Sequence, residues 1–417
     1  MGLFDFVKSL KQKNIVEKQK ELDFKNMTLM YENQPVVDVE MAERGIGKIV
    51  NIHNEKLFPI GVKKSEIISL KDSFNIWLEY KTIPQGRPNI NECLQKLNMK
   101  TPYELSCKSF YLSFNDSFWF KPKNANIQWE DINLFDNGFS SDIGDILFNP
   151  NTNKITINYI SPDSTTNGLD AKRWLIENGT AYLLKTNYNI EQMAYNEVFA
   201  MEIAKRLQLS VAEYSIVKGS IVIGEQEIPC IFSKSKNFCN KGDIVLPFGY
   251  LRTLTQNNTK KLIDFIKEKH SVAYSNFKKM LILDFIIANE DRHNDNMSIR
   301  IDRNGEWHFG TMYDNGNSMY FEDKTLNGIG NDVKCKFSGH LSNKEIMLQH
   351  INYDDLTFIN EEFMEDTVKI LKNTYSESEM PEERIEALEK SIRGKIDSLI
   401  QYKEQLFQRF NELEEMR

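Results

Sequence analysis

The stretch EDRHNDN, residues 290–296, places carboxylate and amide side chains and one histidine directly after the apolar run LILDFIIA. Its oxygen atoms could bind a divalent cation, and an aspartate could accept a proton. A calcium-binding EF-hand does not fit, because counting from Asp291 puts His293 where an oxygen ligand is needed and Asn296 where a glycine is needed. A zinc site does not fit either, since His293 has no cysteine or second histidine at ligand spacing. We expect His293 to brace the loop by hydrogen bonds.

Phosphoryl transfer fits this stretch better. Asp291 and Asn296 have the spacing of the catalytic Asp and metal-binding Asn of protein kinases, and YDNG follows at 313–316. If Asn304-Gly305 is the turn of a hairpin, Asn296 lies opposite Tyr313, and Asp314 is the next residue along. The pattern therefore predicts that Asn296 and Asp314 bind one Mg²⁺ beside Asp291.

A second group of residues would contact the nucleotide. Lys185 ends the apolar strand TAYLLK, and Glu197 lies in the following helix, which is the order of a phosphate-binding lysine and the carboxylate that holds it. The loop SPDSTTNGLDAKRW, residues 161–174, is the candidate phosphate cover, with a plain surface loop as the alternative. It has one glycine, Gly168, so we expect the hydroxyl groups of three neighbouring residues to donate hydrogen bonds to phosphate: Ser164, Thr165 and Thr166.

The elements that must position these residues follow from hydrophobic periodicity. Alternating residues predict strands in 28–63, an ENG turn predicts a hairpin before residue 186, and helical patterns cover about 191–207, 259–289 and the C-terminal region. We predict four parts: an amphipathic helix (1–27), an accessory domain (28–148), a nucleotide-covering lobe (149–240) and a mostly helical lobe with the catalytic loop (241–417).

Composition narrows the function classes. The 417 residues carry a net charge of -8, so we do not expect nucleic-acid binding. The five cysteines form no CxxC pair, which favours a reducing cytoplasm. Residues 1–12 have a basic amphipathic pattern, but we expect them to dock on the protein instead of contacting a membrane.

The sequence resembles the HipA-like serine/threonine kinases, bacterial kinase-fold proteins known from toxin–antitoxin modules. The resemblance covers roughly residues 150–400. Its matching stretches are TTNGLDAKRW, AYLLK, YNEVFAMEIAKRLQL, LDFIIANEDRHNDN and MYDNG. It implies an α+β, two-lobed protein-kinase-like fold with an additional mixed α/β N-terminal domain, and ATP and Mg²⁺ as cofactors.

The resemblance also implies roles for the residues named above. Asp291 would be the catalytic base, Asn296 and Asp314 the Mg²⁺ ligands, and Lys185 a phosphate contact paired with Glu197. Because family members phosphorylate a serine in their own phosphate loop, two serines are candidates for autophosphorylation: Ser161 and Ser164. The implied partners are a protein substrate and an antitoxin or regulatory protein.

Other readings stay open. DRHNDN also resembles the catalytic loop of phosphoinositide kinases, so a lipid or small-molecule kinase is the first alternative. A pseudokinase binding module and an enzyme that transfers AMP would use the same residues. The first domain departs from that of the toxin kinases, and the chain contains no helix-turn-helix partner, which puts a toxin role in doubt.

Overall fold

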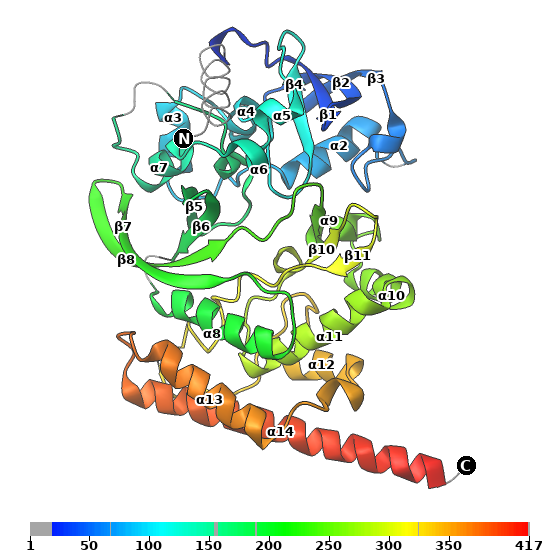
Figure 1. Ribbon diagram of the computed structural model, residues 1–417, viewed down its shortest axis with the longest axis vertical. Helices are drawn as coiled ribbons and strands as arrows, with labels where there is room; N and C mark the ends of the chain where they lie inside the picture. The colour runs from blue at the N-terminus through cyan, green and yellow to red at the C-terminus, as the bar shows by residue number, and fades with distance from the viewer. Residues whose placement is uncertain (1–18, 67, 154–156, 188–189, 324, 416–417) are drawn as a thin grey trace. The chain divides into compact units, whose positions relative to one another are not determined.

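The computed structural model describes residues 19–66, 68–153, 157–187, 190–323 and 325–415 (Figure 1). The chain divides into two compact units. The first comprises Met1–Tyr188, Lys218–Cys230 and Lys234–Val245, and the second comprises Asn189–Val217, Ile231–Ser233 and Leu246–Arg417. This division differs from the predicted one, because most of the predicted accessory domain and nucleotide-covering lobe belong to the same unit.

The first unit begins with an antiparallel sheet of strand order β3-β2-β1-β4. Its strands are β1 (Asn26–Tyr31), β2 (Gln34–Ala42), β3 (Gly45–Ile52) and β4 (Phe118–Pro122). The alternating pattern of residues 28–63 correctly predicted the first three. The helices of this part are α2 (Leu70–Glu79), α3 (Ile90–Lys96), α4 (Pro102–Lys108), α5 (Trp129–Ile132), α6 (Leu134–Asn137) and α7 (Asp142–Phe148).

A hairpin follows in the same unit. It consists of β5 (Ala171–Glu177) and β6 (Thr180–Thr186), joined as predicted by the two residues Asn178 and Gly179. Their φ angles of 50° and 77° are those that a tight hairpin turn requires. The hairpin lies in a sheet of order β5-β6-β8-β7, in which β7 (Tyr214–Ile223) and β8 (Gln226–Lys236) have residues of both units.

One aromatic core explains why the accessory segment and this hairpin form a single unit. Phe110, Phe114, Trp119 and Trp129 pack in one cluster with Trp174 of β5. The rings of Phe114 and Trp174 lie 4.9 Å apart. Aromatic side chains bury large apolar areas, so cutting the chain at residue 148 would expose both sides of this core.

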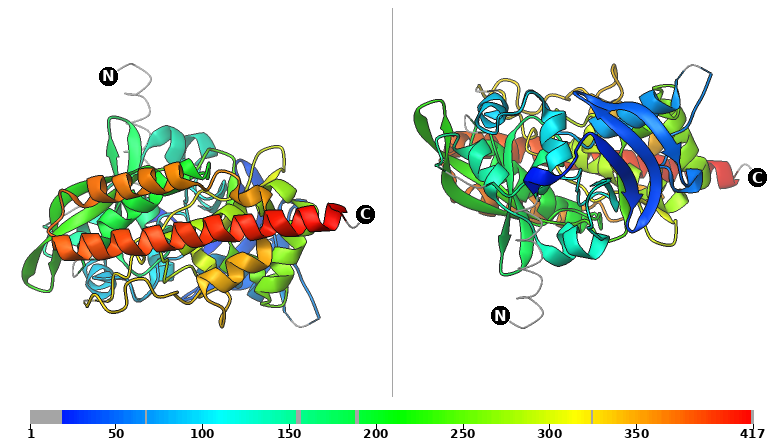
Figure 2. Two further views of the ribbon diagram at one scale, coloured as in Figure 1. Left: turned by 90° about the horizontal axis from the view of Figure 1, so that it is seen from below. Right: turned by 90° about the horizontal axis from the view of Figure 1, so that it is seen from above.

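The second unit is mostly helical. It contains α8 (Gln192–Arg206), α9 (Phe248–Thr253), α10 (Thr259–Lys269), α11 (Ser271–Ile286), α12 (Asn343–His350), α13 (Glu361–Tyr375) and α14 (Glu382–Glu415). A small sheet has the order β11-β10-β9, with β9 (Ile244–Pro247), β10 (Ser298–Ile301) and β11 (Trp307–Phe309), and the first two residues of β9 belong to the first unit. The helices α13 and α14 lie side by side (Figures 1 and 2).

The hairpin of β10 and β11 has a different register from the predicted one. Ile299 pairs with Phe309 and Ile301 with Trp307, so Asn304-Gly305 is not a two-residue turn. The Oδ1 atom of Asp302 accepts hydrogen bonds from the backbone of Asn304 at 2.9 Å and of Glu306 at 3.0 Å. This side chain stabilises a three-residue loop, which shifts the facing partners by one position.

The predicted N-terminal helix is also corrected where the structure describes it. Residues 1–18, including the segment considered for membrane contact, lie outside the described residues. Gln19–Glu21 form one 3₁₀ turn, and β1 begins at Asn26, so a helix does not continue to residue 27. Within the described part of the chain, no helix is both long and apolar enough to cross a bilayer.

Candidate catalytic site

The residues of the candidate catalytic loop, 289–296, follow a buried helix of the second unit. The second half of α11 is buried on nearly all sides, which fixes the start of the loop at Asn289. A 3₁₀ turn spans Asn294–Asn296, and the Nδ1 atom of His293 accepts a hydrogen bond from the backbone of Asp295 at 3.1 Å. His293 therefore braces the loop, as expected.

Arg292 joins the catalytic loop to the YDNG stretch. Its Nε and Nη2 atoms donate to the two carboxylate oxygens of Asp284, each at 2.9 Å, and both side chains are buried. Its Nη1 atom donates to the backbone oxygens of Asn296 at 2.8 Å and Tyr313 at 3.4 Å. Asn315 Oδ1 accepts from Nη2 at 2.5 Å. One guanidinium thus holds both loops, a role that the sequence reasoning missed.

A signal for this contact was nevertheless present in the sequence. Asp284 is a lone carboxylate in an otherwise apolar part of a buried helix. A buried charge needs an opposite charge and hydrogen bonds, so a nearby arginine was the natural partner to seek.

The Asp291 carboxylate is held by two donors. Asn317 Nδ2 donates to Oδ2 at 2.7 Å, and Lys336 Nζ donates to Oδ1 at 2.6 Å. The Asp291 side chain keeps 19% of its surface exposed, while Lys336 is 56% exposed. The carboxylate is therefore oriented but accessible. Lys336 and Asn317 belong to no motif that could have been found in the sequence.

Asn296 and Asp314 lie on the two segments that Arg292 ties together. Asn296 Nδ2 donates to the backbone oxygen of Asp291 at 3.1 Å, and the hydroxyl of Tyr313 donates to the backbone of Asp295 at 2.8 Å. Asp314 has a φ of 60°, a left-handed conformation that aspartate tolerates better than most residues. Arg292 and Tyr313 therefore connect the two segments, and the predicted proximity of the Asn296 and Asp314 side chains stays a prediction.

These residues match the chemistry of a magnesium site. Asp314 supplies a carboxylate and Asn296 an amide oxygen, and Mg²⁺ is usually held by one or two protein oxygen ligands together with water and phosphate. Among the described residues, no group of three or more His, Cys, Asp or Glu side chains is placed to hold a metal ion. A metal at Asn296 and Asp314 would therefore need water or phosphate as further ligands. The metal role of the pair stays a prediction.

The helix α8 supports the YDNG stretch from another side. Glu197, only 1% exposed, accepts a hydrogen bond from the backbone of Asn315 at 2.8 Å. Its neighbour Asn196 donates to the backbone oxygens of Gly316 and Ser318, each at 2.7 Å. Glu197 therefore positions the loop that carries Asp314, a contact that the sequence did not indicate.

Lys185 belongs to the first unit, in β6. Its Nζ lies 3.3 Å from Oδ2 of Asp170, and its side chain is 11% exposed. The predicted pairing of Lys185 with Glu197 of the second unit stays a prediction. Asp170 lies in the candidate phosphate loop, so an ion pair connects the lysine to that loop.

The hydroxyl groups expected to bind phosphate are turned into the protein. Ser161 caps a 3₁₀ turn at Pro162–Thr165, and its hydroxyl donates to Asp163 at 2.9 Å. Ser164 Oγ donates to the backbone of Ser161 at 3.3 Å, and Thr165 Oγ1 donates to the backbone of Leu112 at 2.6 Å. Thr166 Oγ1 donates to the backbone of Pro162 at 2.7 Å. In this conformation each of these hydroxyls donates to an acceptor within the protein, and the phosphate-binding role of the loop stays a prediction.

Burial also separates the two autophosphorylation candidates from solvent. Ser161 and Ser164 have no exposed surface in this conformation. A phosphate donor could reach either hydroxyl only after the turn leaves its place.

The accessory segment clamps the next residues of this loop. Arg87 donates through Nε to the backbone oxygen of Gly168 at 2.8 Å, and through Nη2 to Thr166 at 2.8 Å and Asn167 at 3.0 Å. Lys172 Nζ also donates to Asn167, at 3.1 Å. Burial lowers the pKa of Arg87 to about 10, although nearby carboxylates oppose this change. The shape of the loop thus depends on a cation from the accessory segment.

Gly168 is required at the centre of the clamp. Its φ is 92°, and a Cβ atom at this position would lie 2.3 Å from Nζ of Lys172. Any other residue would displace the lysine and strain the backbone. This glycine serves loop packing, whatever the loop binds.

Neither a protein-family model nor a curated protein sequence matches the chain. Among solved structures, the crystal structure of a Helicobacter pylori proinflammatory kinase, CtkA, is similar over 56% of this chain and 94% of that chain, with a TM-score of 0.45 and 19% identity.

Proposed function

We propose that this chain is an ATP- and Mg²⁺-dependent phosphotransferase, a HipA-like protein serine/threonine kinase. The observation that carries the proposal is the accessible Asp291 carboxylate, held by Asn317 and Lys336 in a loop that Arg292 ties to the segment of Asp314. Phosphoryl transfer needs an oriented carboxylate and oxygen ligands for the metal ion nearby. The protein itself has little covalent chemistry to perform.

The residues divide the reaction between them. Asp291 orients the hydroxyl of a serine or threonine substrate and accepts its proton as the oxygen bonds to the γ-phosphorus of ATP and the bond to ADP breaks. Asn296 and Asp314 would hold Mg²⁺, which when bound neutralises charge on the phosphates. Glu197 and Arg292 keep the Asp314 segment in place. The assignment of Lys185 as a phosphate contact is carried by the sequence pattern alone.

The experiment is phosphate transfer from labelled ATP. The full chain is incubated with Mg²⁺ and ATP labelled at either the α or the γ phosphate, with a cell lysate as the source of substrates, beside Asp314→Ala and Asp291→Asn. We expect transfer of the γ label only, reduced about 10²- to 10⁴-fold in Asp291→Asn while ATP binding is retained. The matched control is Asp264→Asn on the exposed side of α10, which should transfer label at the wild-type rate.

Each other outcome contradicts a definite part of the proposal. Transfer of the α label would identify an enzyme that transfers AMP. ATP binding without transfer of either label would indicate a pseudokinase. A wild-type rate in Asp291→Asn would show that Asp291 is not the base.

A further inference from the structure

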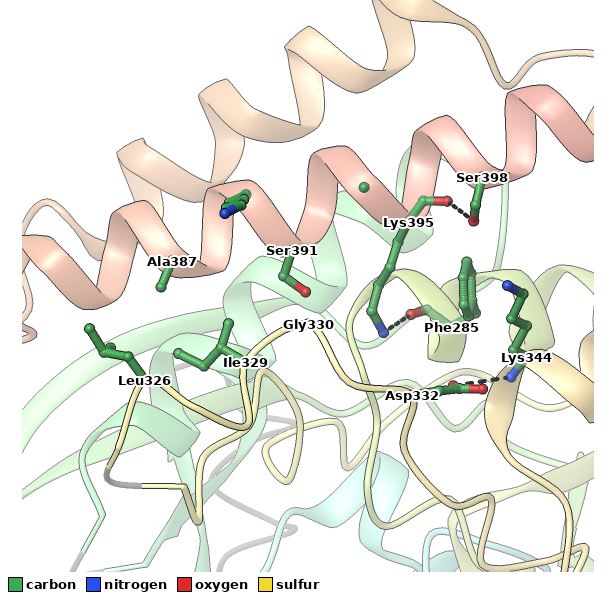
Figure 3. Close-up of a pocket in the computed structure, with 12 residues that line it drawn as sticks. Phe285, Leu326, Ile329, Gly330, Asp332, Lys344, Ala387, Ser391, Lys395 and Ser398 are labelled. Carbon is green, nitrogen blue, oxygen red and sulfur yellow. Dashed lines mark hydrogen bonds between the residues drawn. The ribbon is translucent and has the colours of Figure 1, made fainter.

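The second unit contains a pocket that the proposed reaction does not use. It has a volume of about 540 Å³ and is formed by α14, the loop 326–332, the C-terminal turn of α11 and the start of α12 (Figure 3). None of the proposed catalytic or metal-binding residues lines it. This volume is within the range of small-molecule sites in proteins.

Small residues on α14 keep the pocket open. Ala387, Ser391, Gly394 and Ser398 follow one another at intervals of three or four positions, and all four line the pocket. Apart from its chain neighbours and the nearby backbone of α14, a Cβ atom at Gly394 would have no atom within 4 Å. Glycine inside a helix is less favourable than alanine by roughly 0.5–1 kcal/mol. The helix α14 nevertheless has a glycine at position 394, where a larger side chain would narrow the pocket.

The opposite wall is tied to the same helix. The hydroxyl of Tyr320 donates to the backbone oxygen of Asn331 at 2.9 Å and lies 3.1 Å from the hydroxyl of Ser391. Arg384, near the start of α14, donates to the backbone oxygens of Tyr320 and Asp323, each at 2.6 Å. Hydrogen bonds thus hold the loop against the helix on one side of the pocket, and the pocket is already formed in this conformation.

Most of the charged residues that line the pocket are cationic. Lys344, Lys390 and Lys395 line it, with Asp332 as the one carboxylate among its lining residues. The Asp332 carboxylate accepts from the backbone nitrogen of Lys344 at 3.4 Å. Neither Lys344 nor Lys390 has an ion-pair partner within the described parts of the chain, and both side chains are exposed.

Lys395 is the most informative of the three lysines. It is only 6% exposed, and its Nζ donates to the backbone oxygen of Phe285 at 2.7 Å (Figure 3). It also lies 4.9 Å from the centre of the Phe285 ring. An ammonium group has three N–H donors. Among the described residues, the backbone oxygen of Phe285 is the one hydrogen-bond acceptor of Lys395. A buried cation with so few acceptors is unfavourable unless an anion approaches it.

We propose that this pocket binds a small molecule bearing a phosphate group, with the phosphate held by Lys395, Lys390 and Lys344. The oxygens of a phosphate accept several hydrogen bonds from cations at once. The apolar part of the ligand packs against the side chains on the other walls, namely Leu326, Ile329 and Phe285. Leu326 is 41% exposed and would be covered by such a ligand.

The pocket also adjoins the start of the catalytic loop. Phe285 lies in the last turn of α11, and the loop begins at Asn289. A ligand that draws the ammonium of Lys395 away from the Phe285 oxygen changes the cap of this helix. Binding of the ligand itself does not depend on the proposed kinase activity, so the two proposals can fail separately.

The test uses phenyl phosphate, which joins an apolar ring to one phosphate, titrated into the full chain by calorimetry at constant ionic strength. Three variants are compared: Lys395→Met, Gly394→Leu and Lys369→Met. Lys369 is an exposed lysine on α13 away from the pocket lining and is the matched control. We expect about tenfold weaker binding in Lys395→Met, since a charged hydrogen bond is lost. Gly394→Leu should abolish binding by filling the pocket, and Lys369→Met should bind as the wild type does.

A second arm varies the pH and the probe. Burial lowers the pKa of Lys395 to about 8, although the negative charges of Asp332 and Glu290 act to raise it. The side chain is therefore mostly charged at pH 7 and mostly neutral at pH 9. Wild-type affinity should therefore fall several-fold between these values, and Lys395→Met should show no such fall. Inorganic phosphate should bind more weakly than phenyl phosphate, and phenol more weakly still.

Three outcomes would overturn the proposal. These are no binding of phenyl phosphate to the wild type up to about 10 mM, equal affinity in Gly394→Leu, or equal affinity in Lys395→Met together with an unchanged pH dependence. Thermal unfolding checks that each variant folds. Because the Cβ of Gly394 meets open space, the Gly394 variant remains informative if Lys395→Met does not fold.

Discussion

Arg292 and Asp284 form a doubly hydrogen-bonded ion pair, with two N–O distances of 2.9 Å, between the candidate catalytic loop and the helix that precedes it. Neither side chain reaches solvent to a significant extent. Because the same guanidinium donates to the backbone of Asn296 and Tyr313, the pair sets the position of both segments of the candidate site. Its contribution can be measured without any knowledge of the substrate.

Asp284→Asn should lower the free energy of unfolding by about 3–5 kcal/mol, because it leaves the Arg292 charge buried without its counter-charge. Chemical denaturation measures this loss. Lys205→Ala, which breaks the exposed ion pair with Glu202, is the control and should change stability by less than about 1 kcal/mol. A loss below 1 kcal/mol in Asp284→Asn would mean that the pair does not organise the site.

Local patterns in the sequence predicted the elements well. The hairpin turn at Asn178-Gly179 and the helices around the catalytic loop follow from turn chemistry and from periodicity, which depend on neighbouring residues. The register of the next hairpin was wrong by one residue, because the side chain of Asp302 stabilises a three-residue loop in place of a tight turn. From the sequence alone, an aspartate whose side chain accepts hydrogen bonds from its own loop is hard to distinguish from an aspartate that points into solvent.

Long-range contacts were less predictable. The sequence predicted roles for Asp291, Asn296 and Asp314, but it did not indicate Lys336, which contacts Asp291 from 45 positions away. Nor did it show that the hydroxyls of the candidate phosphate loop face inward, since the donors and acceptors that hold the loop come from residues 83–112. Such pairings depend on how distant segments pack, and no local spacing encodes them.

Arg87→Met should loosen the candidate phosphate loop. The substitution keeps an apolar side chain but removes the donors to three successive backbone oxygens, at Thr166, Asn167 and Gly168. Leaving buried acceptors unsatisfied costs about 1–3 kcal/mol for each group. Hydrogen exchange should become at least about tenfold faster in residues 164–170, where local opening becomes easier.

The control for this experiment is Arg44→Met, at an exposed arginine of the same unit, which should leave exchange in the loop unchanged. Unchanged exchange in Arg87→Met would show that Lys172 alone suffices to hold the loop. If the proposed kinase activity is found, the same variant should raise the KM for ATP more than it lowers kcat.

Two glycines in helices should respond in opposite ways to alanine. Gly394→Ala on α14 adds a Cβ atom in open space, so it should stabilise the protein by roughly 0.5–1 kcal/mol. Gly144→Ala on α7 places its Cβ 2.8 Å from both the Cβ of Arg173 and a carboxylate oxygen of Asp163, and should destabilise it by about 1–3 kcal/mol. Thermal unfolding of both variants gives the comparison, and stabilisation by Gly144→Ala would contradict the packing described for α7.

Glu290, the residue before Asp291, should make stability depend on pH. Burial raises its pKa to about 7, and the neighbouring carboxylates Glu322 and Asp323 add to this. Between its ordinary pKa of about 4.5 and about 7, the folded state binds more protons at this residue than the unfolded state, so stability falls as the pH rises through this window. The side chain is only partly buried, and after allowance for solvent screening the change is about 1–2 kcal/mol.

Glu290→Gln removes this titration and the repulsion from Glu322 and Asp323. The variant should therefore be more stable than the wild type at pH 8, by about 1 kcal/mol. The difference should shrink towards pH 4.5, where the wild-type carboxyl is protonated in the folded state and half protonated in the unfolded state. Denaturation of both proteins from pH 4.5 to 8 measures the two curves. Parallel curves would show that Glu290 ionises in the folded protein as it does in the unfolded chain, and that the carboxylates around the catalytic loop do not act on it.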